Sequence, residues 1–387
     1  MTQPVRLSSD FYRGRTAALQ ELLESARLDG ILVLNYANVI YLSGFYHIPS
    51  ERPIGVYVPL RSQPILFAPL LEQENSDESW IEDRRFYFEY PGEEHPIAWM
   101  LHQIDAPKRR IGIDDVPFGV LARVSANFVI THCTVVDQMR WTKTPEELAL
   151  VEQAAMYADY CLEYLLAHAA DMIRVGATEL DLLRECLGAT HKRMNAEVGT
   201  MFRLGGGGVV GTIHSGPRAA LPHGAPGTRQ PRAGDTLIAG IGAAVGGYHA
   251  ESGATFIVGE PTADQMRCLR AAAACSDAAI QTLRVGNSCE AVNAAALDVL
   301  HNAGLGDFIR HRIGHGMGIQ AHEPPWLAPG DPTLLAAGMV FSNEPGIYRP
   351  NVDGYRTINT MIVTDGEARV PSRFLANHPP EARVIPI

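Results

Sequence analysis

The sequence predicts an α+β protein in which a small α/β domain, residues 1–138, precedes a larger domain of helices and strands, residues 139–387. The chain has 387 residues, which is long enough for two domains and a sizeable core. In the first domain, short apolar runs alternate with amphipathic segments, a pattern typical of a small α/β domain. In the second, helical and strand-like sequence alternate in two similar rounds, which predicts a domain of two related halves.

The elements of residues 1–138 follow from apolar spacing. Apolar residues recur every three or four positions in residues 11–28, which predicts an amphipathic helix ended by Asp29-Gly30. A second helix is expected at 96–103. Strands are expected at 31–34, 55–59, 64–67, 86–90 and 111–113, with a strand or turn at 39–42.

A long helix opens residues 139–387. Thr144 is a suitable N-cap and Glu147 completes a capping box, while Pro145 suits the first turn. This helix is expected to reach about Ile173. Further helices are expected at 178–198, 262–283 and 288–304, with strands and turns at 201–259 and from 311 onward.

Charge and cysteine content limit the class of partner and the compartment. The net charge is −11 without a cluster of Lys and Arg, so neither nucleic acid nor an anionic membrane is expected. The first residues lack a signal-peptide core, and no apolar run approaches the roughly 20 residues of a membrane span. Six scattered cysteines without a Cys-x-x-Cys indicate neutral thiols in a reducing cytoplasm and give no support to a cysteine nucleophile.

Two glycine-rich segments do not predict nucleotide binding. Gly205–Gly208 is not followed by Lys and Ser or Thr, which excludes a P-loop. Gly240–Gly246 follows a strand, but the next residues are strand-like, whereas a dinucleotide site needs the N-terminus of a helix there. This second segment is therefore interpreted as a hairpin.

Three residues in the last quarter of the chain are candidates for catalysis. His315 stands in Gly-His-Gly-Met-Gly, where the glycines on either side leave its imidazole unshielded. His322 follows seven residues later. Glu344 ends an apolar run just before a Pro-Gly turn, where a carboxylate can point into a pocket.

Ordered motifs between residues 139 and 365 resemble those of the pita-bread superfamily, peptidase family M24. This group includes prolidases, proline-specific and methionine aminopeptidases, and creatinase. Residues around Tyr41-Leu-Ser-Gly-Phe resemble the creatinase-type N-terminal domain. The motifs are Arg140-Trp-Thr-Lys-Thr-Pro-Glu-Glu, Ser215-Gly-Pro-Arg-Ala-Ala-Leu-Pro-His, Gly247-Tyr-His, Gly314-His-Gly-Met-Gly, His322-Glu-Pro, Asn343-Glu-Pro-Gly and Gly354-Tyr-Arg-Thr.

The resemblance implies five metal ligands, Asp, Asp, His, Glu and Glu, of which this chain retains only part. The matching positions are Gly240, Glu251, His315, Glu344 and Ile358. Because Gly240 and Ile358 offer no ligand atom, a two-metal cluster with bridging carboxylates is not expected. No cofactor is expected, although a single metal on Glu251, His315 and Glu344 stays open.

The resemblance to metal-independent creatinase assigns further roles. His223 falls on the catalytic histidine and would act as general base, with His315 and His322 orienting the reacting centre. Glu344 and Glu251 would hold a cationic group of the substrate. Arg52, reaching over from a partner subunit, would bind a carboxylate, which implies a homodimer with its site near the interface. Trp326 replaces a second carboxylate-binding arginine and would wall the substrate together with Tyr248.

Three functions remain open from the sequence. The first is a metal-independent hydrolase that cleaves a non-peptide C–N bond, in a guanidine, urea, cyclic amidine or amide, of a small zwitterionic substrate. The second is an Xaa-Pro dipeptidase or aminopeptidase-like metallopeptidase with an altered one-metal site. The third is a catalytically inactive pita-bread protein that only binds a ligand. The first is the main expectation, because two ligand positions are lost.

Overall fold

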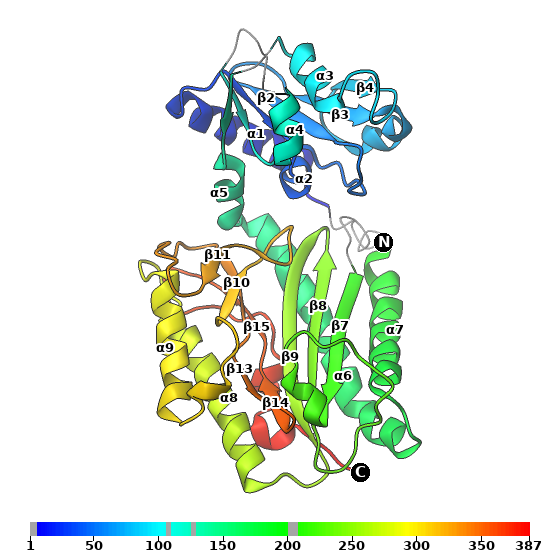
Figure 1. Ribbon diagram of the computed structural model, residues 1–387, viewed down its shortest axis with the longest axis vertical. Helices are drawn as coiled ribbons and strands as arrows, with labels where there is room; N and C mark the ends of the chain where they lie inside the picture. The colour runs from blue at the N-terminus through cyan, green and yellow to red at the C-terminus, as the bar shows by residue number, and fades with distance from the viewer. Residues whose placement is uncertain (1–5, 106–109, 125–128, 200–207) are drawn as a thin grey trace. The chain divides into compact units, whose positions relative to one another are not determined.

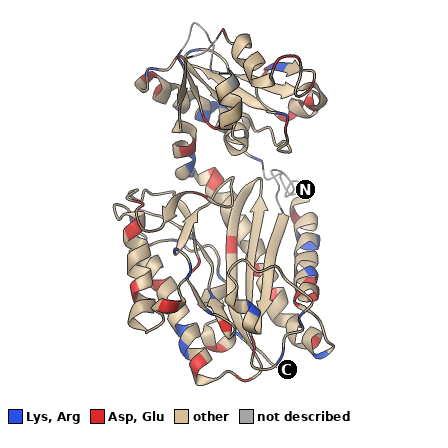
Figure 2. Ribbon diagram, viewed as in Figure 1, with Lys and Arg blue, Asp and Glu red and all other residues tan. Residues whose placement is uncertain are grey.

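The computed structural model describes residues 6–105, 110–124, 129–199 and 208–387. Within them the chain forms two compact units, an N-terminal unit, Arg6–Arg140, and a C-terminal unit, Trp141–Ile387. Basic residues are interspersed with acidic ones along both units (Figure 2). No helix among the described residues is long and apolar enough to cross a membrane.

The N-terminal unit is built on a six-stranded mixed sheet in the order β4-β3-β2-β1-β5-β6. Its buried core includes Leu32 and Phe67, which pack with Met100 and Leu101 of α3. The strands are β1 Gly30–Val33, β2 Gly55–Pro59, β3 Ile65–Pro69, β4 Asp83–Tyr87, β5 Ile111–Ile113 and β6 Ile130–His132. The helices are α1 Ser9–Ser25, α2 Tyr36–Ser43, α3 Pro96–Gln103, α4 Phe118–Val124 and α5 Val135–Trp141.

The expectation of a strand or turn at 39–42 is wrong, because these residues lie within α2. The side chain of Asn35 caps this helix by accepting the Ala37 N–H, and Gly44 ends it with a φ of 67°. All but the first of its residues are buried. A short apolar run that is buried nearly all round has no one-sided periodicity, so spacing alone cannot separate helix from strand.

The first half of the C-terminal unit is a four-stranded sheet in the order β16-β9-β8-β7, with α6 and α7 packed on it (Figure 1). The long hairpin of β8 and β9 turns at Gly246 and Gly247, both at positive φ, as the hairpin interpretation predicts. Residues 205–207 of the other glycine run lie outside the described residues. The bounds are α6 Pro145–Arg174, α7 Glu179–Val198, β7 Gly208–Ser215, β8 Thr236–Val245, β9 Tyr248–Val258 and β16 Val384–Ile385.

The second half pairs helices α8 and α9 with the sheet β11-β10-β12-β15 and the hairpin β13-β14. Leu300, Phe341 and Tyr355 are fully buried in the core between them. The bounds are α8 Ala263–Thr282, α9 Cys289–Asn302, β10 Gly314–Gly316, β11 Glu323–Leu327, β12 Val340–Asn343, β13 Gly346–Arg349, β14 Asp353–Arg356, β15 Asn359–Ile362 and α10 Phe374–Asn377.

Capping boxes begin three of the long helices of the C-terminal unit. The box of Thr144 and Glu147 opens α6, as predicted, and Thr178 and Thr262 open α7 and α8 in the same way. The six cysteines are free thiols, five of them buried.

Candidate functional site

A cavity of about 360 Å³ in the C-terminal unit gathers four of the eight predicted site residues. Its lining includes Glu251 of β9, Glu344 just after β12, and two imidazoles, His223 and His322, from connecting segments. A cavity of this size is typical of a small-molecule site. We call it the first cavity.

His315 lies directly against this group and is fully buried. Its ring stacks on that of His322, with centroids 3.7 Å apart and planes inclined by 19°. The glycines around it are required by close backbone packing rather than by access to the ring. A Cβ on Gly314 would lie 1.8 Å from the Ser342 carbonyl oxygen, and one on Gly316 would lie 2.6 Å from that of Glu323.

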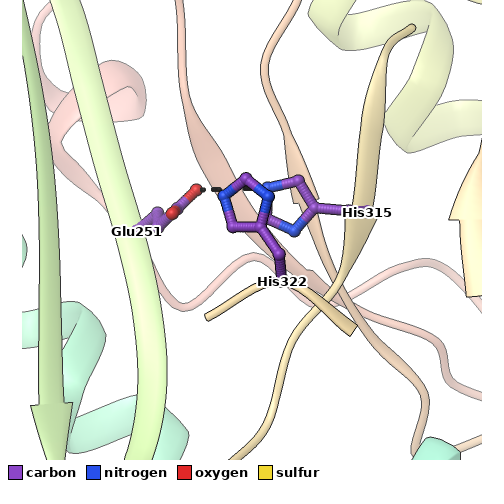
Figure 3. A group of neighbouring side chains, drawn as sticks. All are labelled: Glu251, His315 and His322. Carbon is purple, nitrogen blue, oxygen red and sulfur yellow. Dashed lines mark ion pairs between the residues drawn. The ribbon is translucent and has the colours of Figure 1, made fainter. Parts of the chain in front are cut away.

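The Nε2 atom of His315 faces two carboxylates. It lies 3.4 Å from Glu344 Oε1 and 3.8 Å from Glu251 Oε2, and it has no well-aligned hydrogen bond among the described residues. The other ring nitrogen, Nδ1, donates a hydrogen bond to the Gly316 carbonyl oxygen at 3.1 Å. Ser342 Oγ donates to Glu251 Oε2 at 2.7 Å and fixes that carboxylate. Figure 3 shows Glu251 and the two imidazoles converging.

The buried charges shift each other's pKa in opposite directions. Burial lowers the pKa of His315, but the two nearby carboxylates, Glu344 and then Glu251, outweigh it, so the pKa is raised above 6.5. Burial raises the pKa of Glu344, and His315 together with Arg356 overcomes this and lowers it to about 2. Burial raises the pKa of Glu251. His322 is driven the other way, to a pKa of about 4, by burial and then by the charge of His315.

These groups fit one divalent cation. Glu251, His315 and His322 each offer a ligand atom, and the three atoms lie within 4.8 Å of one another. Two imidazoles and one carboxylate are a donor set suited to Zn²⁺ or a similar ion. His315 offers a nitrogen without a well-aligned hydrogen bond, and the low pKa of His322 keeps its imidazole neutral. The single-metal alternative predicted from the sequence used Glu251, His315 and Glu344. The structure groups His322, rather than Glu344, with the other two ligands.

A second metal ion does not fit beside the first. A Cβ on Gly240, where the family resemblance implies an aspartate, would lie 2.8 Å from Arg356 Nη2 and 3.2 Å from Ile358 Cδ1. A Cβ on Gly253, the residue opposite Gly240, would lie 2.6 Å from the same methyl group. A guanidinium and an apolar side chain therefore fill the space into which further carboxylates would project.

Arg356 is a site residue that the sequence reasoning missed. It is buried and lines the first cavity, and its Nη1 donates to the Pro222 carbonyl oxygen at 3.1 Å. Its Nε has no hydrogen-bond partner among the described residues. Arg356 stands in the family motif Gly354-Tyr-Arg-Thr, and this position could have indicated a role in the site.

Two predicted substrate-binding residues of the C-terminal unit do not line the first cavity. Trp326 pairs with His315 across β10 and β11, and its ring lies 4.6 Å beneath the guanidinium of Arg312, beside a different pocket. Tyr248 is buried, and its hydroxyl donates to Glu147 at 2.8 Å. The substrate-binding roles of both stay predictions without support from the geometry.

Arg52 belongs to the N-terminal unit and is already ion-paired there. Its Nε and Nη2 donate to the two carboxylate oxygens of Glu89 at 2.6 and 3.1 Å, and Glu51 pairs with Nη1. A substrate carboxylate would have to compete with these groups. The cross-subunit role of Arg52, and the homodimer that it implies, stay predictions.

Comparison with known proteins defines the class. The model of metallopeptidase family M24 matches residues 149–365, and that of the creatinase/prolidase N-terminal domain matches residues 15–142. The chain therefore belongs to metallopeptidase family M24, with a creatinase-type N-terminal domain before a pita-bread catalytic domain. This confirms the predicted family and the predicted α+β fold class.

Particular relatives are named for peptide hydrolysis. A probable dipeptidase PepE of Mycobacterium tuberculosis is 28% identical, over 99% of each chain. An Xaa-Pro dipeptidase of Lactobacillus helveticus is 28% identical, over 89% of this chain and 93% of its own. The crystal structure of dipeptidase PepE from Mycobacterium ulcerans superposes with a TM-score of 0.85 at 28% identity, covering 99% of this chain and 100% of that one.

These findings contradict the main functional expectation. A metal-independent hydrolase of non-peptide C–N bonds was predicted because two ligand positions are lost, but the named relatives are dipeptidases, which favours the peptidase alternative. The family's five ligand positions do not include His322, whose ring the fold stacks against His315 beside Glu251, so the loss of two of those positions does not exclude a metal.

Proposed function

We propose that this chain is a dipeptidase that uses one divalent cation held by Glu251, His315 and His322. The observation that carries the proposal is the convergence of these three ligand atoms beside a cavity, with His315 Nε2 buried and without a well-aligned hydrogen bond. The dipeptidase relatives, which match nearly the whole chain, support the same reaction class.

A cation bound here would supply Lewis-acid polarisation of the peptide carbonyl and of the attacking water. The side chains of the cavity would bind the substrate and transfer protons. Glu344, with a pKa of about 2, stays ionised and is a poor proton acceptor at neutral pH, so its role is to hold positive charge in the cavity. The free ammonium group of a dipeptide is the cation that it would bind.

The two remaining polar groups suit the other end of a dipeptide. Arg356, buried at the cavity wall with an unpaired Nε, would bind the free carboxylate, which a dipeptide carries next to its scissile bond. His223 is an exposed residue that lines the cavity, and its imidazole would take a proton from the attacking water and then pass it to the leaving amine. A site with a cation-binding end and an anion-binding end accepts a dipeptide more readily than a long peptide.

The test combines metal analysis with a substrate panel. The protein is stripped with a chelator and reloaded separately with Mn²⁺, Co²⁺ and Zn²⁺, and hydrolysis of Ala-Pro, Leu-Pro, Ala-Leu and Ala-Pro-Ala is followed. We expect one equivalent of metal per chain, loss of activity on stripping, recovery on reloading, and dipeptides cleaved in preference to the tripeptide.

A pair of matched variants locates the metal. Glu251→Gln should weaken metal affinity by at least about 10-fold, whereas Glu260→Gln, at an exposed position after the same strand, should leave it unchanged. Dipeptide hydrolysis that survives complete removal of metal would overturn the proposal. So would a metal-loaded protein that cleaves none of the four peptides.

A further inference from the structure

A second cavity, of about 380 Å³, lies in the C-terminal unit on the other side of the segment 357–359 from the first. Thr357 and Asn359 line the second cavity, whereas Ile358 between them lines the first. Side chains alternate between the two faces of an extended segment, so one short stretch of chain separates the two cavities. None of the residues assigned to the peptidase site lines the second cavity.

The second cavity contains a buried guanidinium with two nitrogens that make no hydrogen bond. Arg383 is 1% exposed, and its Nε and Nη1 have no hydrogen bond among the described residues. The backbone of Arg383 is engaged, since its carbonyl oxygen accepts the Ile257 N–H. The neighbouring carboxylate of Glu381 pairs instead with the exposed Arg270.

Arg383 keeps its charge despite this burial. Burial lowers the pKa of Arg383 to about 10, so the side chain remains a cation at neutral pH. The charge of Glu381 acts on Arg383, but no ion pair joins the two side chains among the described residues. A buried cation whose hydrogen bonds are not made is strongly unfavourable, and an anionic ligand would complete them. The position of Arg383 in the cavity lining indicates an anionic ligand.

A second unpaired polar group lines the same cavity. The hydroxyl of Thr357 is buried and has no hydrogen-bond partner among the described residues. The other buried polar side chains there bond to each other: Asn359 Nδ2 donates to Ser276 Oγ at 3.1 Å, and Ser372 Oγ donates to Asn359 Oδ1 at 3.3 Å. Arg383 and Thr357 are thus left with donors for a ligand.

The remaining walls select among anions. Much of the lining is apolar, and it includes Ala273, Ile280, Val370, Leu375, Pro379 and Pro380. Two exposed residues of opposite charge, Asp277 and Arg373, also line the cavity and offset each other, which leaves the single positive charge of Arg383 to be matched by the ligand. An apolar body with a single negative charge fits this combination better than inorganic phosphate does.

We propose that the second cavity is a binding site for a small organic monocarboxylate with an apolar body. The carboxylate pairs with the guanidinium of Arg383 and accepts a hydrogen bond from Thr357 Oγ, while the hydrocarbon part contacts the apolar wall. The site goes beyond the proposed peptidase function and does not depend on it.

The experiment measures binding to the full chain by calorimetry and by the ligand-induced rise in melting temperature. The probes are isovalerate, L-leucine, L-leucinamide and inorganic phosphate. We expect saturable binding of isovalerate and of L-leucine, whose ammonium group is compatible with the negative charge of Asp277. L-leucinamide, which lacks the carboxylate, and phosphate should not bind. Failure of both carboxylates to bind, or equal binding of phosphate, would overturn the proposal.

Variants separate this cavity from the first, which also contains an arginine. Arg383→Met should abolish isovalerate binding, whereas Arg356→Met should retain it. Arg383→Met should also leave the melting temperature of the free protein unchanged or higher, because it removes an unpaired buried charge. If Arg383→Met does not fold, Thr357→Val replaces it and should weaken binding about 3-fold or more. Loss of binding in Arg356→Met with retention in Arg383→Met would assign the ligand to the first cavity and reject the proposal.

Discussion

The guanidinium of Arg356 lies against Gly240, with its Nη2 atom 2.8 Å from the place that a Cβ on this glycine would take. The two positions are therefore coupled. A side chain at residue 240 and the present position of Arg356 exclude each other, and the positive charge of Arg356 opposes a second cation nearby. This relationship, together with Ile358 over Gly253, disfavours a second dication beside the one proposed.

Restoring carboxylates tests that limit. Gly240→Asp alone should still bind one equivalent of Mn²⁺, because the new carboxylate pairs with Arg356. The double variant Gly240→Asp/Ile358→Glu should bind a second equivalent, because it adds an unpaired carboxylate and removes the apolar side chain. Gly240→Ala is the steric control. Metal content after gel filtration measures all three, and two equivalents in Gly240→Asp alone would contradict the role given to Arg356.

Tyr248 is expected to stabilise the fold without contacting the substrate. Its buried hydroxyl donates to Glu147. Burial raises the pKa of Glu147, and its hydrogen bonds, including this one, only partly oppose that rise. Tyr248→Phe leaves that acceptor with one hydrogen bond fewer and should cost about 1–3 kcal/mol of unfolding free energy. The values of kcat and KM for a dipeptide should not change. A rise in KM at unchanged stability would restore the substrate-binding role predicted from the sequence.

The buried ion pair of Lys143 and Glu323 is expected to hold the segment that carries His322. Lys143 Nζ donates to Glu323 Oε1 at 2.8 Å, and both side chains are 2% exposed. Lys143→Met leaves a buried carboxylate without its counter-charge and should destabilise the protein by roughly 3–5 kcal/mol in urea unfolding. The double variant Lys143→Met/Glu323→Leu should recover much of this loss. Equal destabilisation by the single and double variants would show that the pair is not the cause.

Much of the fold follows from local signals in the sequence. The capping box of Thr144 and Glu147 and the apolar spacing after it predict the start of α6, and the structure begins the helix at Pro145. The turn glycines Gly246 and Gly247 mark the β8–β9 hairpin in the same way. These features depend on neighbours within a few residues. Helix α2 does not, because its burial by surrounding elements removes the polar face that a pattern needs.

The residues of the site could be predicted from the sequence motifs, but their arrangement in space could not. The motifs around His315 and Glu344 predict that these side chains share a site, and the structure places Nε2 and Oε1 3.4 Å apart. The stacking of His322 on His315 depends on the path of the loop between β10 and β11, and the approach of Arg356 to Gly240 depends on packing between two sheets. Such long-range contacts decide whether the site holds no metal, one or two.

The site also predicts a pH dependence that reverses when metal is added. In the metal-free protein, the raised pKa of His315 contributes stability that is full below its ordinary pKa of 6.5 and is lost as pH rises through the folded-state value. Glu251, whose pKa is also raised, acts in the same direction. Glu344 contributes stability that is present above 4.5 and is lost as pH falls toward about 2. The ion pair of His315 and Glu344 therefore contributes most between about 4.5 and 6.5, and more at pH 6 than at pH 8.

A bound dication competes with the proton for His315 Nε2, so metal affinity should rise with pH. We expect the melting temperature of the stripped protein to show a smaller contribution from His315 at pH 8 than at pH 6, and the increment produced by Mn²⁺ to be larger at pH 8. The variant His315→Asn serves as the control and should lose both effects, because it lacks the titrating imidazole. Scanning calorimetry at the two pH values, with and without Mn²⁺, measures the increment directly. An Mn²⁺ increment that is larger at pH 6, or one that persists in His315→Asn, would show that the cation binds elsewhere.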